Sequence, residues 1–167
     1  MAQWASIEEI YTFRKVKYYT VRLEDDPHSE MEKFILRFEM DAEFQNDFEN
    51  IVTLLGTLGN VKGAKSRYFR DESAAQALPP EIREALRENW VQFIDANLRL
   101  FCLRMSDEIV ILLNGGIKSS QKTNDSPDLA GKFSFAQQVS KAIDLKIRHR
   151  ELQVVGNQLI GDFEIFI

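Results

Sequence analysis

The stretch LRLFCLRMSDEIVILLN, Leu98 to Asn114, decides the fold. Its two halves, LRLFCLRM and EIVILLN, are apolar at nearly every position and are separated by Ser106 and Asp107. Strands that are apolar on both alternating faces are typical of the buried centre of a sheet. The two-residue connection favours a hairpin, although Ser-Asp is not the strongest tight-turn pair. We therefore expect two adjacent central strands, on which Arg99 and Arg104 face opposite ways unless a bulge intervenes.

The N-terminal part predicts one strand followed by a helix. The segment KYYTVRLED, Lys17 to Asp25, is rich in Tyr, Thr and Val, and an Asp-Pro pair ends it. Ser29 and Glu32 then form an S-x-x-E capping-box pattern. Apolar residues at helical spacing follow, which predicts a helix over about 30–39.

A second helix is predicted directly after the first, over about 42–58. Asp41 is its expected N-cap. Gly56, Gly59 and Asn60 are expected to close it. Acidic residues are frequent along both helices, which indicates a solvated outer face or a docking face for a basic partner.

The middle of the chain predicts a strand and an additional helix. The segment AKSRYFRDE, Ala64 to Glu72, reads as a strand with Tyr68 and Arg70 on one side. Two consecutive prolines interrupt it, and the apolar spacing beyond them predicts a helix over about 81–97.

The C-terminal third predicts a loop, a helix and a β element. GGIKSSQKTND, Gly115 to Asp125, follows the second apolar strand as a polar loop. Ser134 and Gln137 repeat the capping-box pattern and place a helix start there. The pattern over about 152–167 predicts strands that turn at Gly156-Asn157.

The predicted order is therefore strand, two helices, strand, inserted helix, two strands, loop, helix and a β extension. That order indicates an α+β fold with a small, mostly antiparallel sheet. A length of 167 residues fits one domain, 1–167.

Composition restricts the environment and the class of partner. A net charge of −5 argues against generic nucleic-acid binding, although VKGAKSRYFR, Val61 to Arg70, holds four bases and no acid. The single cysteine, Cys102, excludes an intramolecular disulfide and lies in an apolar run. The N-terminal residues do not resemble a secretory leader, and IVILL is too short to cross a membrane. We expect a cytoplasmic protein without a membrane partner.

The familiar catalytic signatures do not occur in the sequence. GGIKS lacks the G-x-x-x-x-G-K-[ST] spacing of a phosphate-binding P-loop. His28 and His149 are far apart and are interpreted as surface residues. Because no metal-ligand set is visible, we expect neither a metal site nor a cofactor.

A basic set around the predicted sheet remains as the candidate site. Arginine and lysine can cleave RNA without a metal if they neutralise the phosphorane-like transition state and one group moves a proton. A tyrosine can stack on a base. The same residues also fit the ordinary rim of a sheet, and composition alone favours that interpretation. The set is Lys65, Arg67, Tyr68, Arg70, Arg99, Arg104, Lys118 and Lys122.

The segment Leu98 to Asp125 resembles the RelE/HigB group of toxins of type II toxin–antitoxin systems (RelE/ParE superfamily). That group shows a Tyr-Arg strand, a turn, an aliphatic strand and a loop close to K-K-T-Q-K-T. Here Leu98-Arg99-Leu100, Ile109 to Leu113 and Lys118 to Thr123 stand at these places. The order of elements is similar over most of the chain, whereas Ser119 replaces the middle loop lysine and Leu98 replaces the strand tyrosine.

The resemblance implies a RelE-like fold and a ribosome-dependent mRNA endoribonuclease that acts without a metal. Its catalytic residues would be Arg99, Lys118 and Lys122, with RNA contacts from the other members of the basic set. Its partners would be mRNA on the ribosome and a cognate antitoxin, for which a helix-turn-helix protein is one candidate. Two alternatives stay open: a catalytically inactive toxin-fold protein that binds another protein, and a ParE-like inhibitor of DNA gyrase.

Overall fold

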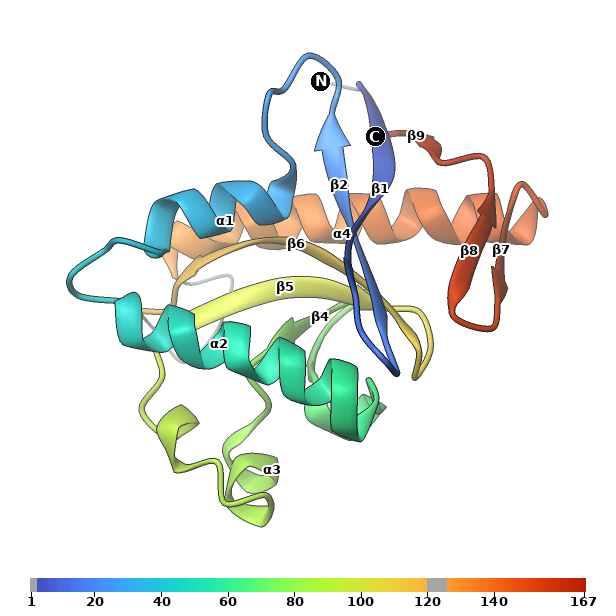
Figure 1. Ribbon diagram of the computed structural model, residues 1–167. Coiled ribbons are helices and arrows are strands. Elements are labelled where there is room, and N and C mark those ends of the chain that lie inside the picture. Colours follow the sequence, from blue (N-terminus) through green and yellow to red (C-terminus); the bar gives the residue numbers. More distant parts are fainter. Residues whose placement is uncertain (1–2, 120–125) are drawn as a thin grey trace.

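A seven-stranded sheet forms the centre of the protein (Figure 1), as the computed structural model, which describes residues 3–119 and 126–167, shows. Its strand order is β3-β4-β5-β6-β2-β1-β9. All pairs are antiparallel except β2 with β6, which are parallel, so the predicted α+β class is confirmed. The strands are β1 (Trp4–Thr12), β2 (Lys17–Leu23), β3 (Arg70–Glu72), β4 (Ala75–Leu78), β5 (Leu98–Arg104), β6 (Ile109–Ile117) and β9 (Glu164–Phe166).

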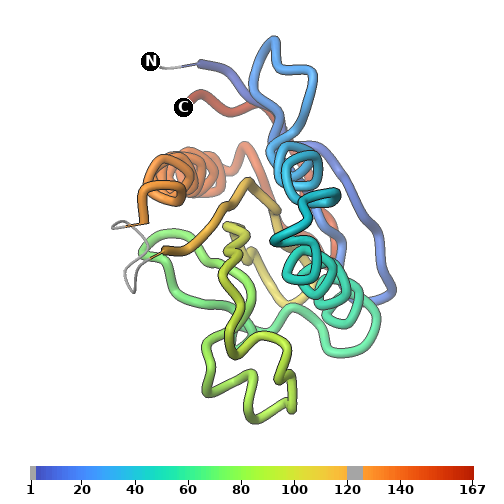
Figure 2. Tube along the Cα trace, turned by 90° about the vertical axis from the view of Figure 1, so that its left-hand side faces the viewer, coloured from blue at the N-terminus to red at the C-terminus, as the bar shows by residue number. Residues whose placement is uncertain are grey.

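Helices cover both faces of this sheet, and Figure 2 shows α4 on one side with α1 and α2 on the other. A π-helical turn, Leu58–Lys62, extends α2, and short 3-10 turns occupy Ser66–Tyr68 and Val91–Phe93. The helices are α1 (Glu30–Phe38), α2 (Gln45–Thr57), α3 (Ile82–Arg87) and α4 (Pro127–Arg148). Within the described residues, no helix has both the length and the apolar character that a membrane crossing requires.

Strand β5 joins two hydrophobic cores, as its nearly continuous apolar sequence predicts. Leu100 and Cys102 point into the core beneath α1 and α2, whereas Phe101 and Leu103 point into the core beneath α4. Burial of each large apolar side chain stabilises the fold by about 1.5–3 kcal/mol. Because β5 buries such side chains on both of its faces, it contributes to the stability of both cores. Burial also raises the pKa of the Cys102 thiol, so this cysteine is a packed, unreactive group.

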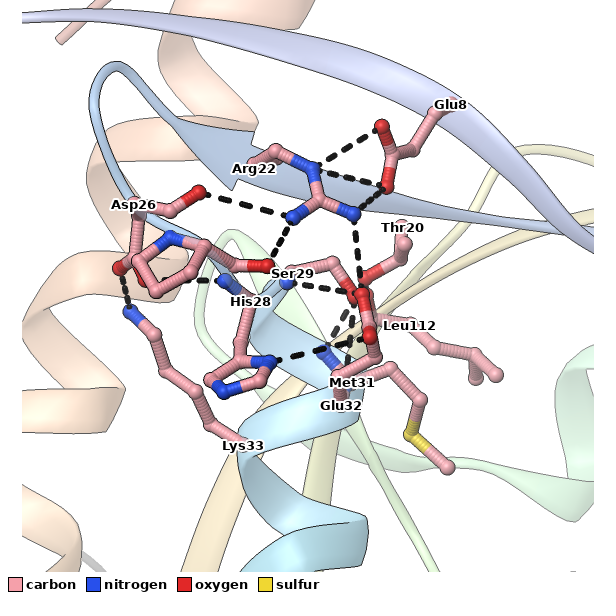
Figure 3. Close-up of polar contacts among 11 residues, drawn as sticks. Glu8, Thr20, Arg22, Asp26, His28, Ser29, Met31, Glu32, Lys33 and Leu112 are labelled. Atoms are coloured by element: carbon pink, nitrogen blue, oxygen red, sulfur yellow. Dashed lines mark hydrogen bonds and ion pairs between the residues drawn. The ribbon is translucent and has the colours of Figure 1, made fainter.

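The junction between β2 and α1 confirms the capping box and adds an ion-pair network around it (Figure 3). The Ser29 hydroxyl accepts a hydrogen bond from the Glu32 amide, and the Glu32 carboxylate accepts one from the Ser29 amide. Arg22 then bonds both Glu8 and Glu32, at 2.8 and 3.0 Å. The Met31 amide in α1 donates to the Thr20 hydroxyl, which donates to the Leu112 carbonyl, so the start of α1 is fixed to the middle of the sheet.

Several predicted boundaries at the N-terminal half are wrong. Residues 4–12 form β1, which the alternation at this end did not reveal because only part of the strand is buried. Helix α2 begins at Gln45, since the Asp41 side chain closes a turn by accepting from the amides of residues 43 and 44. Gly63, with a φ of +80°, ends the helical segment after the π turn, so Gly56 and Gly59 lie within it.

The middle segments also differ from their prediction. Residues 66–68 form a 3-10 turn instead of a strand, and strand pairing starts only at Arg70. The helix predicted over 81–97 is limited to α3, because Asn89 adopts a left-handed conformation with a φ of +61°. Strand β4, which precedes the two prolines, was not predicted and pairs with β5.

At the C-terminal end, α4 begins at Pro127, so Ser134 lies inside the helix and is no cap. The turn at Gly156-Asn157 is confirmed and joins β7 (Leu152–Val155) to β8 (Gln158–Gly161) in a separate two-stranded sheet. The final strand, β9, pairs with β1 and therefore belongs to the main sheet.

Candidate functional site

Three cationic side chains meet where β3 and β5 begin and β6 ends. Arg99 lies opposite Gly116 on β6, and Lys118 follows two residues later. The Lys118 amide donates to the Asn97 carbonyl at 2.6 Å, which holds this lysine beside the start of β5. Arg70 is brought in by the ladder β3-β4-β5, because it pairs with Ala77. We name Arg70, Arg99 and Lys118 the cationic triad.

Backbone carbonyl oxygens accept the hydrogen bonds of the two arginines of the triad. Arg99 is only 6% exposed and donates to the carbonyls of Ala96 and Leu98, at 3.1 and 3.0 Å. Arg70 donates to the carbonyls of Pro79 and Pro80, at 2.8 and 3.2 Å. Within the described ranges, 3–119 and 126–167, no carboxylate forms an ion pair with any member of the triad. Backbone carbonyls thus orient the two guanidinium groups.

This arrangement makes each cation less stable in its charged form. Burial, followed by repulsion from Arg70, lowers the pKa of Arg99 to about 10. Burial, then Arg99 and Arg70, lowers the pKa of Lys118. Burial likewise lowers the pKa of Arg70. A bound anion would relieve this repulsion, and arginine and lysine donors bind phosphate strongly in such partly buried sites.

One carboxylate, Glu72 on β3, acts electrostatically on all three cations. Its negative charge opposes the lowering of the pKa of each of them. Glu72 is half-buried, and its backbone carbonyl accepts a hydrogen bond from the Gln137 side chain at 2.6 Å. A carboxylate beside a cluster of cations is a candidate proton acceptor, and the sequence interpretation did not identify it.

Two glycines and an aspartate fix the backbone that carries Lys118. A side chain at Gly115 would collide with the Arg99 carbonyl oxygen, and one at Gly116 would collide with the Asp128 carboxylate. Asp128, in the first turn of α4, accepts from the Ile117 amide at 2.7 Å and from Arg37 at 2.9 Å. The Gly-Gly pair before the lysine loop therefore permits the close approach of three elements. It was the available sequence signal for this junction.

The other predicted site residues do not join the triad. Lys122 lies outside the described residues. Arg104 stands at the opposite end of β5, roughly 17 Å from Arg99 for five residues of strand. There it donates to the Ala64 carbonyl and pairs with Asp107. A bulge between Leu100 and Cys102 does not bring the two arginines together, because they lie at different ends of the strand.

Tyr68 is unavailable for stacking on a base, which corrects its predicted role. Its ring is fully buried, 5.5 Å from the ring of Trp90. The hydroxyl accepts from Arg67 at 2.9 Å and donates to Glu88 at 3.1 Å. Burial, then this bond to Glu88, raises the pKa of Tyr68. Arg67 lies over the ring and pairs with Glu84, so both residues serve local packing.

Lys65 lies elsewhere, at the hairpin end of β5 and β6, with Arg14, Lys15 and Lys62. The seven predicted residues that the structure describes are therefore divided between the triad, the packing around Tyr68 and this second basic region. Among the residues described, no three His, Cys, Asp or Glu side chains gather closely enough to hold a metal ion.

Comparison with family models, with curated proteins and with solved structures finds no match for this chain. Conclusions about function therefore come from the geometry and electrostatics of the site.

Proposed function

We propose that this protein is the toxin of a type II toxin–antitoxin system, a RelE/HigB-like endoribonuclease that cleaves mRNA on the ribosome. The observation that carries the proposal is the cationic triad, whose arginines are oriented by backbone carbonyls and whose charges repel one another in a partly buried position. Arg99 and Lys118 occupy the places of the strand arginine and a loop lysine in the resemblance. A cytoplasmic location and a cognate antitoxin follow from the same proposal.

The triad suits stabilisation of a pentacoordinate phosphate. In metal-independent cleavage, the 2′-oxygen attacks phosphorus, the bond to the 5′-oxygen breaks, and a 2′,3′-cyclic phosphate forms. Negative charge grows on the non-bridging oxygens during this step. Arg99 and Arg70 would bind those oxygens, because guanidinium groups match their geometry.

Proton transfer would involve Glu72 and Lys118. Glu72 would accept the proton of the attacking 2′-hydroxyl. Lys118 would donate a proton to the departing 5′-oxygen, and its lowered pKa makes the ammonium group a better acid than a free lysine. These two roles balance the protons of the cleavage step without a metal ion.

Expression in a bacterial host from a tightly repressed promoter tests the proposal. Wild-type protein is expected to arrest growth and to fragment mRNA within coding regions. Arg99→Gln should relieve both effects, whereas Arg83→Gln, at an exposed arginine of α3 outside the triad, should not. Growth without mRNA fragmentation, or equal toxicity of Arg99→Gln, would contradict the proposal. Arrest with intact mRNA and inhibited supercoiling by purified gyrase would indicate the ParE-like activity instead.

A further inference from the structure

A pocket with a basic lining lies at the opposite end of the sheet from the triad. It has a volume of about 360 Å³ and opens between the β1–β2 turn, the π-helical turn and the β5–β6 hairpin. We name it the turn pocket. Its charged lining residues are Arg14, Lys15, Lys62, Lys65, Asp107 and Glu108.

The turn pocket has a fixed backbone. The Lys15 amide donates to the Gly59 carbonyl at 2.6 Å, and the Arg14 amide donates to the Asn60 side chain at 3.2 Å. Phe13 packs so closely on Gly59 that a Cβ there would lie 2.6 Å from its ring. Departures from regular α-helix such as this π turn are frequent at functional sites. The two basic segments are therefore held together by the fold.

Positive charge exceeds negative charge in the turn pocket. Lys62 pairs with Glu88 at 3.3 Å, and Asp107 pairs with Arg104, so these charges are compensated. Over the described part of the chain, the side chains of the remaining three bases and of Glu108 form no ion pair, which leaves three positive charges against one negative charge. Lys15 has a structural role, since its ammonium donates to the Val61 carbonyl at 2.8 Å near a helix end.

Arg14 and Lys65 have no such structural explanation. Both are exposed, and neither side chain donates a hydrogen bond to a described residue. Their charges lie on either side of an open pocket on a protein whose net charge is −5. This local reversal of sign favours an anionic ligand with several phosphates.

We propose that the turn pocket is a second binding site for RNA phosphates, which contributes affinity and takes no part in cleavage. The inference rests on the proposed function, because it assigns the ligand from the same RNA substrate class. Arg104, which borders the pocket through Asp107, lies roughly 17 Å along β5 from Arg99. The two sites therefore bind phosphates that are several nucleotides apart, and only a long RNA reaches both.

Fluorescence anisotropy with 2′-O-methylated RNA, which cannot be cleaved through its 2′-oxygen, tests this inference. Labelled oligonucleotides of 4 and 16 nucleotides would be titrated with wild-type protein and with Arg14→Gln/Lys65→Gln. The matched control is Arg83→Gln/Lys141→Gln, which removes two exposed charges elsewhere. Lys15 is left intact because it stabilises the helix end.

The pocket variant is expected to bind the 16-mer about tenfold more weakly at 100 mM salt. The slope of log affinity against log salt should become shallower by about 1.4, or roughly 0.7 for each lost contact with single-stranded RNA. Affinity for the 4-mer should not change, since the triad can bind it alone, and the control should match wild type. Equal 16-mer affinity in the pocket variant, or an equal loss in the control, would overturn the inference.

Two further arms separate this inference from the proposed function. Polyglutamate of matched charge should compete poorly for the wild-type protein, and competition equal to that of RNA would overturn the assignment of phosphates. If the pocket variant loses 16-mer affinity while wild-type protein leaves ribosome-bound mRNA intact, the pocket assignment stands and the nuclease proposal fails. If wild-type protein cleaves mRNA but the variant binds the 16-mer normally, the nuclease proposal stands and the pocket assignment fails.

Discussion

Arg22 on β2 and Arg99 on β5 belong to the same sheet, two strands apart. Their surroundings shift the pKa of the two guanidinium groups in opposite directions. Arg22 bonds the carboxylates of Glu8 and Glu32 and the Pro27 carbonyl, and the bond to Glu8 contributes most to raising its pKa (Figure 3). Arg99 is more deeply buried, bonds the backbone carbonyls of Ala96 and Leu98, and has a pKa lowered to about 10. The chain thus neutralises one arginine and leaves the other, together with two more cations, without an ion-pairing carboxylate in the described structure.

Under the proposed function, this difference separates a structural arginine from an arginine that binds the substrate. The Arg22 network fixes the start of α1 to the sheet, and every charge in it serves that junction. The triad instead maintains repulsion between one buried cation and two partly buried cations, which costs stability and persists in proteins where a ligand or a reaction requires it. Substitutions at the two places should therefore have opposite consequences for activity and for stability.

The largest expected effect is on activity. Lys118→Met should lower the rate of mRNA cleavage about 100-fold, because it removes both a charge near the phosphate and the proposed proton donor. Arg22→Met should keep wild-type activity at temperatures where it is folded. Single-turnover cleavage rates on programmed ribosomes measure both variants, and equal losses in the two would remove the distinction between the regions.

The second effect is on stability, where the Arg22 substitution should cause the greater loss. Arg22→Met leaves Glu8 and Glu32 close together without their cation and should lower the free energy of unfolding by about 1 kcal/mol, a value reduced by solvent screening. Arg99→Met replaces a buried charge whose pKa is lowered by burial and by Arg70, and it should leave stability unchanged or raise it. Urea denaturation followed by circular dichroism measures both. A stability loss in Arg99→Met that exceeds the loss in Arg22→Met would contradict this account.

The smallest effect concerns pH. Lys118 has a lowered pKa, so it loses its charge at a lower pH than an ordinary lysine. Affinity for the 4-nucleotide RNA should therefore fall as pH rises from 7 towards 10, when the triad loses positive charge. Lys118→Arg stays protonated over this range and should show a smaller decrease in affinity. Parallel pH profiles for the two proteins would indicate that Lys118 does not contact the phosphate.

The sequence predicted those features that depend on local pattern. The two central strands, the capping box of α1 and the turn at Gly156-Asn157 follow from residues that are neighbours in the chain. The parallel pairing of β2 with β6 was not predictable in this way, because its partners lie about 90 residues apart, as Thr20 and Leu112 do. Only the strand register then brings Lys118 beside Arg99.

The candidate site shows the same division. The resemblance selected Arg99 and Lys118, and the structure places them on and just after adjacent strands. The roles of Tyr68 and Arg104 could not, because Trp90 buries the tyrosine ring and the length of β5 separates the two arginines. Glu72 and Asp128 reach the site through tertiary pairing, for which the sequence gives no local signal.

Purified protein added to a reconstituted translation system with one defined mRNA tests the central claim most directly. Mapping of the RNA ends should show ribosome-dependent cleavage by the wild-type protein and by Arg22→Gln, and none by Arg99→Gln. Intact mRNA with the wild-type protein, or cleavage by Arg99→Gln at the wild-type rate, would contradict the claim that the cationic triad is a nuclease site.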